Sequence, residues 1–281
     1  MWRDKQIKFL TESECSELGI INILEEYNLK IKDVKEKQIL NQIINDFREN
    51  NFSLLTSQEM NYLLRNSKEK WAPYIIHRYK FHYYENNTEM PDFPLYLILE
   101  PVSSCNLRCP FCMQSDEKFT SNKDMMGMME LELFKKIIDE AYELGTKAIT
   151  LTGRGEPTLN PHIEEMLEYC SGKFIEIKMN TNATVLNERM CHKILKSGLT
   201  DLVFSVDSYY KEEFESLRVN ANFEKVVSNV KKFKEIKEEF YPNSSCVTRA
   251  SGVQVSDKQN LEKFEEFWKE MVDFVVMVRM I

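Results

Sequence analysis

The chain has 281 residues, of which 43% are hydrophobic and 29% charged, and this composition is typical of a soluble globular protein rather than a disordered one. Its formal net charge of −8 argues against broad binding to nucleic acids or anionic membranes. The start of the sequence has no export signal and no apolar run is long enough to span a bilayer, so we expect a cytoplasmic protein with reduced thiols and with no membrane or nucleic-acid partner.

The N-terminal part of the chain is predicted to be mainly helical. Two stretches, Thr11–Glu14 and Thr56–Glu59, match the capping box, in which a threonine is followed by a glutamate three positions later. Apolar residues recur at three- and four-residue spacing in this part, and neither Gly nor Pro interrupts the chain from Ile21 to Arg65. We interpret the aromatic and basic segment Trp71–Asn86 as a connector packed over the neighbouring domain.

A turn-rich segment with two prolines, Asn86–Pro94, is the predicted domain boundary. We therefore assign residues 1–92 to an N-terminal, mainly helical region of unknown role and residues 93–281 to a second domain. In the second domain, apolar stretches that read as strands alternate with helical patterns. The predicted strands are 95–102, 147–153, 174–181, 201–207, 245–256 and 272–281, and the helices are 129–145, 160–172, 186–198, 209–218, 222–240 and 258–271.

Apolar strands joined by helices predict an α/β fold with a parallel sheet and right-handed crossovers. An open, partial barrel and a doubly wound sheet both fit this periodicity. In either fold, ligands bind where strands meet the helices that follow them. Polar motifs follow four of the strands, so we expect them to converge on one rim: CNLRCPFC (105–112), GRGEP (153–157), NTN (180–182) and SVDS (205–208).

Cys105, Cys109 and Cys112 place three thiols within eight residues. Thiolates bind zinc, copper(I) or iron–sulfur clusters. A structural zinc needs a fourth protein ligand, and the four histidines show no pairing. A 4Fe–4S cluster held by three cysteines instead leaves one iron open for a substrate or cofactor. The remaining cysteines are far apart and are interpreted as ordinary thiols: Cys15, Cys170, Cys191 and Cys246.

The C-x3-C-x2-C spacing, with Phe111 before the third cysteine, resembles that of the radical S-adenosylmethionine (SAM) enzymes. GRGEP, MNTNA and FSVDS resemble further motifs of that family, in the same order and at strand ends. The resemblance covers residues 94–281 and implies a partial (β/α)6 TIM-like barrel. The strands and motifs of this sequence most resemble those of SPASM-type members, although the sequence lacks the cysteine-rich C-terminal SPASM domain. A natural short form, a split gene and a truncated product all remain open.

The resemblance also implies an activity. Cys105, Cys109 and Cys112 would hold a 4Fe–4S cluster that binds SAM and cleaves it reductively, and the 5′-deoxyadenosyl radical would abstract hydrogen from a substrate. We expect an electron donor such as flavodoxin or ferredoxin. Modification of a peptide or protein is slightly favoured over that of a small molecule or sugar. The alternatives are a non-catalytic iron–sulfur or zinc-binding protein and an inactive truncated fragment.

The same resemblance implies SAM contacts by Phe111, Gly153, Gly155, Glu156, Asn180, Asn182, Ser205, Asp207, Arg218 and Val253. Arg154 stands where many members have another glycine. Glu156 is interpreted either as a charge partner of the SAM ammonium group or as a brace for its loop. Arg218 is either a partner of the SAM carboxylate or a solvated helix charge. The NTN motif has a second interpretation as a turn capped by asparagine.

Overall fold

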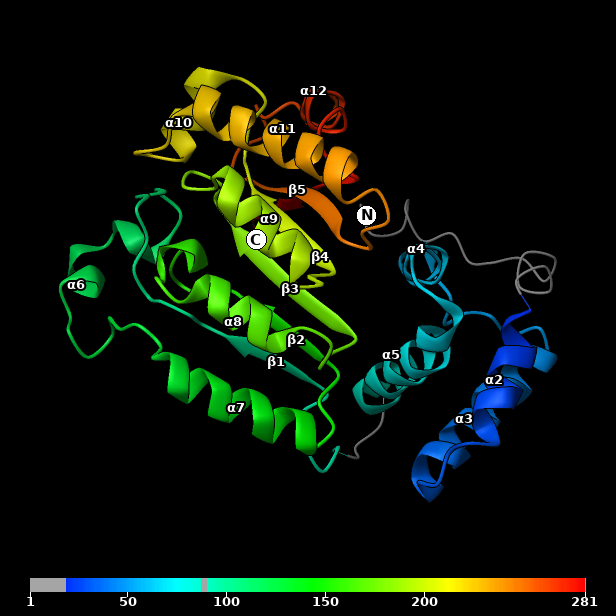
Figure 1. Cartoon of the computed structure of the whole chain (residues 1–281). Coiled ribbons are helices and arrows are strands. Elements are labelled where there is room, and N and C mark those ends of the chain that lie inside the picture. Colours follow the sequence, from blue (N-terminus) through cyan, green and yellow to red (C-terminus); the bar gives the residue numbers. More distant parts are fainter. Residues whose placement is uncertain (1–18, 87–89, 281) are drawn as a thin grey trace. The chain divides into compact units, whose positions relative to one another are not determined.

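The computed structural model describes residues 19–86 and 90–280 (Figure 1). The capping box predicted at Thr11–Glu14 and the thiol of Cys15 lie outside these described residues. The described chain forms two compact units, one ending at Leu95 and the other beginning at Tyr96.

The first unit is helical. Its α-helices are α2 (Ile20–Asn28), α3 (Val34–Arg48), α4 (Ser57–Arg65) and α5 (Trp71–Asn86), and a short 3-10 helix, η2 (Lys68–Lys70), precedes α5. The capping box predicted at the start of α4 is confirmed, because the Thr56 N–H donates to Glu59 Oε2 at 3.1 Å and the Thr56 hydroxyl caps the helix. The predicted connector forms helix α5, which packs against α2 and α3.

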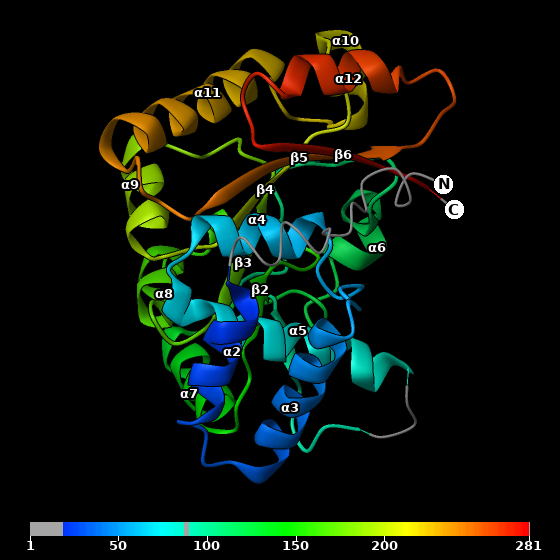
Figure 2. The same cartoon turned by 90° about the vertical axis from the view of Figure 1, so that its right-hand side faces the viewer.

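The second unit is built on a sheet of six parallel strands. They are β1 (Tyr96–Leu99), β2 (Ala148–Leu151), β3 (Glu176–Thr181), β4 (Asp201–Ser205), β5 (Val247–Gln254) and β6 (Phe274–Arg279). Each strand pairs with the next along the chain, in the order β1-β2-β3-β4-β5-β6 (Figures 1 and 2). A doubly wound sheet would reverse its strand order part-way. The observed order therefore excludes that alternative and confirms the partial barrel.

Helices follow the strands and cover the outer face of the sheet (Figure 2). They are α7 (Leu131–Glu143), α8 (Ile163–Cys170), α9 (Glu188–Lys196), α10 (Lys211–Leu217), α11 (Phe223–Phe240) and α12 (Leu261–Trp268). Their apolar residues recur on one side, as in α7, where Phe134, Ile138 and Ala141 are buried. Three short elements were not predicted, because each is too short to show a periodicity: η3 (Met113–Ser115), α6 (Glu117–Thr120) and η4 (Pro157–Leu159).

Side chains alternate between the two faces of the strands. In β3, Ile177 and Met179 are buried toward the helices, while Lys178 and Asn180 project from the opposite, concave face. In β4, Phe204 contacts a phenylalanine of α11, so its neighbour Ser205 lies on the concave face. The carboxyl ends of the strands thereby present polar residues on one side, at the rim of the open barrel.

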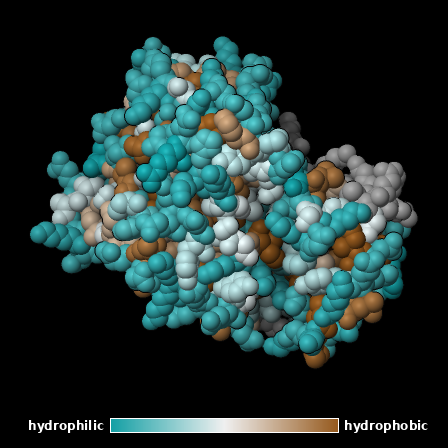
Figure 3. Space-filling model, in the orientation of Figure 1, coloured by the Kyte–Doolittle hydropathy of each residue, from teal (hydrophilic) through white to brown (hydrophobic). Residues whose placement is uncertain are grey.

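The face of the molecule seen in Figure 3 is mostly hydrophilic, with apolar residues scattered in small groups. Within the described ranges, we find no helix with both the length and the apolar character needed to cross a membrane.

Candidate functional site

A cavity of about 270 Å³ lies at the carboxyl ends of the first four strands. Three thiols enter it from the loop after β1, two glycines from the loop after β2, and polar side chains from the ends of β3 and β4. All the site residues predicted from the sequence line this cavity except Asp207 and Val253. The structure therefore confirms that the four motifs converge on one rim.

The cysteine loop is partly buried and is anchored to a neighbouring segment. Cys109 is buried, and Cys105 and Cys112 are partly buried. The Arg108 N–H donates to the Val219 carbonyl at 3.0 Å, which ties the loop to the segment after α10. Burial raises the pKa of the Cys105 and Cys109 thiols. A metal ligand must be the thiolate, so cluster assembly here would release protons.

Gly155 is required by a close approach between two loops. A Cβ at this position would collide with the backbone carbonyl oxygens of Val102 and Ser104. The next residue, Glu156, donates its N–H to the Ser104 carbonyl at 2.9 Å. Because backbone atoms cannot move aside as a flexible side chain can, the glycine allows the β2 loop to lie against the cysteine loop.

Arg154 binds a neighbouring carboxylate. Its guanidinium lies 2.6 Å from Glu100 Oε1, and its own N–H donates to Glu100 Oε2 at 2.6 Å. Burial acts to raise the pKa of Glu100, but the hydrogen bonds from Arg154 and Ser103 outweigh it and hold that pKa below its ordinary value. The residue that departs from the family pattern therefore links the ends of β1 and β2.

Glu156 braces its surroundings. Its buried carboxylate accepts hydrogen bonds from the Thr158 hydroxyl at 2.6 Å, the Thr181 hydroxyl at 2.7 Å and the Asn182 N–H at 2.6 Å. Burial raises its pKa despite these donors. With its acceptor sites directed at the β3 end, this geometry fits the bracing interpretation better than a direct contact with an ammonium group.

Asn182 forms a turn and also contacts the cysteine loop. Its Oδ1 accepts from the Thr184 N–H at 3.0 Å, as the turn interpretation of the NTN motif expects. Its Nδ2 donates to Asn106 Oδ1 at 2.9 Å and lies 3.8 Å from Cys105 Sγ. An amide donor beside a ligand sulfur is one of the interactions that set the potential of iron–sulfur clusters.

Arg218 is not a solvated helix charge. Its side chain is 12% exposed and its Nε lies 2.5 Å from Asp207 Oδ2. Burial acts to lower the Arg218 pKa, but Asp207 together with the nearby Cys109 and Cys105 outweighs it and holds that pKa above its ordinary value. The guanidinium also lies 5.9 Å from the centre of the Phe111 ring. Arg218 is thus held at the cavity wall as a permanent cation.

Asp207 and Val253 lie behind the cavity wall. Asp207 is fully buried, and its second carboxylate oxygen accepts from the Val253 N–H at 2.8 Å. The carboxylate therefore connects the ends of β4 and β5 and orients Arg218. A direct SAM contact by Asp207, as the resemblance implied, would require it to leave these partners.

Gln114 is a cavity residue that the sequence did not reveal. Its Nε2 donates to the carbonyls of Ser103 at 2.6 Å and Arg154 at 2.8 Å. Nothing in the sequence distinguished it from an ordinary polar residue of the loop. Leu107, Thr152 and Arg154 complete the set of lining residues that were not predicted as contacts.

The lining residues fit a 4Fe–4S cluster with SAM beside it. Asn180 Oδ1 and Gln114 Oε1 are buried acceptors without a hydrogen-bond partner, and both residues line the cavity. They suit the amine and hydroxyl groups of SAM. No three His, Cys, Asp or Glu side chains of the described residues converge closely enough to hold a single ion. A cubane cluster is larger than one ion, so its ligands need not converge as closely, and all three cysteines line this cavity.

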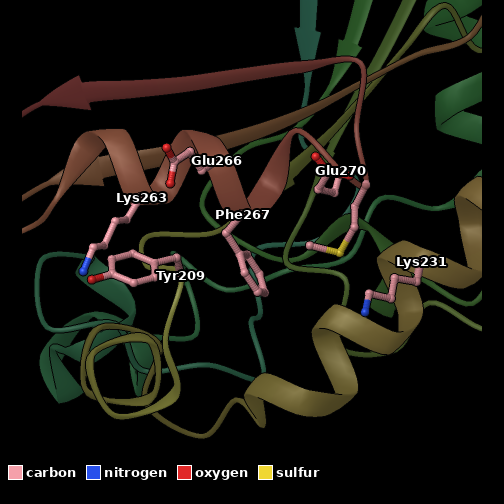
Figure 4. Close-up of a pocket in the computed structure, with 7 residues that line it drawn as sticks. Tyr209, Lys231, Lys263, Glu266, Phe267 and Glu270 are labelled. Atoms are coloured by element: carbon pink, nitrogen blue, oxygen red, sulfur yellow. The ribbon is translucent and has the colours of Figure 1, made fainter.

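A second hollow of about 490 Å³ lies on the outer surface, beside α11 and α12, with Phe267 projecting into it (Figure 4). It shares no residue with the cysteine cavity, and its charged residues have both signs: Lys231, Lys263, Glu266 and Glu270. It therefore has none of the chemistry of the first cavity.

The fold and the cysteine cavity fit an iron–sulfur protein that binds SAM. A sequence model of the radical SAM superfamily matches residues 99–267, more than half of the chain, so the chain belongs to this superfamily. The cofactors of the superfamily are a 4Fe–4S cluster and SAM, which the cavity fits.

Curated relatives match the chain over part of their length. A GTP 3',8-cyclase of Desulforamulus reducens is 28% identical over 66% of this chain and 54% of its own length. A tungsten-containing aldehyde ferredoxin oxidoreductase cofactor-modifying protein of Pyrococcus furiosus is 34% identical over 40% of this chain and 30% of its own length. The chain spans about half the length of the first of these relatives and less of the second.

Solved structures share the fold. Streptococcus suis SuiB bound to S-adenosylmethionine matches with a TM-score of 0.56 and 20% identity, over 89% of this chain and 58% of SuiB. The structure of anSMEcpe with bound AdoMet matches with a TM-score of 0.53 and 22% identity, over 66% and 52% of the two chains. At these identities the likeness establishes the fold alone.

Proposed function

We propose that the chain is a radical SAM enzyme that abstracts hydrogen from its substrate, with a cluster at Cys105, Cys109 and Cys112. The observation that carries this proposal is one cavity that brings three thiols together with the polar ends of β2, β3 and β4. When bound, the reduced cluster and SAM supply a 5′-deoxyadenosyl radical. A scaffold or electron carrier would need the thiols but would not need those polar strand ends.

The residues around the thiols would orient SAM. Arg218, held by Asp207, is placed to bind a carboxylate. Asn180 offers an unpartnered acceptor to an amine or hydroxyl group. Glu156 holds the β3 end in place through Thr181 and Asn182. In this arrangement Glu156 and Asp207 act as positioning residues rather than as direct ligands.

For the substrate, we favour a peptide or protein side chain. SuiB, which shares the fold, has been solved with its precursor peptide SuiA. The described sheet is an open barrel with edges at β1 and β6, which leaves room for a substrate larger than the cavity. A nucleotide is the second candidate, because several of the sequence relatives are GTP 3',8-cyclases. We also propose flavodoxin or ferredoxin as the electron donor.

The test is an anaerobic assay of SAM cleavage. The protein is reconstituted with iron and sulfide, reduced with dithionite and given SAM, and 5′-deoxyadenosine is measured by chromatography. We expect the product from the wild type and none from the triple Cys→Ala variant. A wild type that assembles a cluster yet makes no 5′-deoxyadenosine, with or without a peptide or GTP, contradicts the proposal and favours the non-catalytic or inactive alternatives.

A further inference from the structure

Two cationic side chains project from the concave face of the sheet, next to the cavity. Lys178 of β3 lies two residues before Asn180, so it is about 7 Å deeper along the strand. Arg249 of β5 pairs with Val203, which pairs with Asn180. Because paired residues project from the same face, Arg249 lies level with the Asn180 that lines the cavity.

Neither cation is neutralised at close range. The structure gives neither of them an ion pair with a carboxylate of the described residues, and the Nε of Arg249 is buried without any hydrogen-bond partner. Asp201 pairs with Lys178 across β3 and β4, and its charge acts to raise the pKa of both cations, as that of Glu176 does for Lys178. The Asp201 carboxylate forms no ion pair with either cation and accepts from the Thr200 hydroxyl at 2.9 Å. Burial lowers the pKa of Lys178 and of Arg249, and Arg249 lowers that of Lys178 further.

An unpaired cation in such a place costs stability. Buried charges in proteins are normally paired, because the loss of hydration is otherwise uncompensated. A side chain that served only to fill the barrel would be apolar, as Val203 is beside Arg249. The missing acceptor for Arg249 is therefore best supplied by a molecule that enters the barrel.

We infer that the substrate carries an anionic group, a carboxylate or a phosphate, that binds to Arg249 and Lys178 inside the barrel. The guanidinium fork suits either oxyanion, since both present two oxygens at the matching spacing. With the anion level with Asn180, the rest of the substrate reaches the rim where the thiols lie. This inference rests on the proposed function, because it concerns the substrate of that same site.

The test uses the full chain, reconstituted and loaded with SAM. Pyrophosphate and glutarate serve as anionic probes and glutaramide as the uncharged counterpart of glutarate. Binding is measured by isothermal titration calorimetry and by the shift in unfolding temperature. We expect at least one anion to bind the wild type, with at least tenfold weaker binding in Arg249→Gln and in Lys178→Met, and no binding of glutaramide. The preferred probe distinguishes a phosphate from a carboxylate.

The matched control is Arg189→Gln on α9, where the arginine side chain is 78% exposed. This variant should bind the anions as the wild type does. A structural role for Arg249 would instead lower the unfolding temperature of Arg249→Gln without anions, whereas we expect that temperature to stay level or rise. Equal binding by all four proteins, or no anion binding by the wild type, overturns the inference.

Failure of the proposed function gives a different result. Formation of 5′-deoxyadenosine is measured on the same wild-type preparation without pyrophosphate or glutarate, both alone and with a peptide or GTP added. If it is absent, the radical chemistry is contradicted, while the anion site is still decided by calorimetry. If it is present and the anions fail to bind, only the anion site is overturned.

Discussion

Glu156 is the residue whose contacts bear most on how the candidate site would bind SAM. It lies in a glycine-rich motif that suggested direct contact with SAM, yet its carboxylate is buried and engaged by Thr158, Thr181 and Asn182. Glu156 would then affect SAM binding indirectly, because it holds the β3 end in place. The same holds for Asp207, which acts through Arg218.

Glu156→Ala should weaken SAM binding about tenfold or more and leave the cluster intact. The variant leaves the Asn182 N–H and two threonine hydroxyls without their acceptor, at a cost of about 1–3 kcal/mol each where they stay buried. SAM affinity is measured by calorimetry on reconstituted protein, with iron content as the control. An unchanged affinity would refute the positioning role.

Glu100→Gln should lower the free energy of unfolding of the cluster-free protein by about 1–3 kcal/mol at pH 7. The pKa of Glu100 is lower in the folded chain than its ordinary value. Its stabilisation is thus present above the unfolded pKa of about 4.3 and is lost as the pH falls through the folded pKa. The difference between the two proteins should shrink below about pH 4 in denaturant titrations. The exposed Glu132→Gln is the control, and a difference that stays constant with pH would contradict the assignment.

At the scale of elements, the strand ends are joined by contacts between loops that are far apart in sequence. The β2 loop lies against the cysteine loop at Gly155, and the β3 end reaches the cysteine loop through Asn182 and Asn106. The cavity is therefore shaped by the packing of loops on one another.

Gly155→Ala should disrupt this packing. The added Cβ meets backbone carbonyl oxygens of Val102 and Ser104, so one of the two loops must move. We expect impaired cluster assembly and weaker SAM binding, read from the absorbance of the reconstituted protein and from calorimetry. Gly127→Ala, where the structure leaves open space for a Cβ, should behave as the wild type. Equal cluster content in the two variants would show that the loop contact is dispensable.

Most of the elements could be predicted from the sequence, because alternation and helical spacing report local structure. Each of the six strands lies within its predicted range. Periodicity could not choose between a partial barrel and a doubly wound sheet, because local patterns do not report which strands pair with each other. For the same reason the motifs located the cavity, but the partners of Glu156, Arg154 and Asp207 came only from the structure.

At the scale of the whole molecule, the three cysteines lie in one loop. This loop also contacts the segment after α10 and the end of β3. A cluster at this point would add a further link between parts of the second unit that the protein contacts already join. A ligand that binds the folded state also raises its stability by mass action.

Cys109→Ala should abolish cluster assembly, because two cysteines hold a cubane cluster poorly. We expect a loss of iron and of the brown absorbance, and an unfolding temperature close to that of the cluster-free wild type. Cys170→Ala, which removes a buried thiol of α8 far from the motif in sequence, is the control and should keep its iron. A Cys109→Ala protein with full iron content would remove this residue from the ligand set.

The order of the strands has a consequence for how the chain folds. Each strand pairs with the one that follows it in sequence, so no pairing waits for a distant segment to arrive. The segment that closes between two partners is always a single crossover, although the crossovers after β1 and β4 each contain more than one helix, so each step costs less entropy than pairing strands that are not neighbours in sequence. The sheet can therefore grow strand by strand from β1 to β6 as the chain leaves the ribosome, and the thiols, which follow β1, belong to its earliest part.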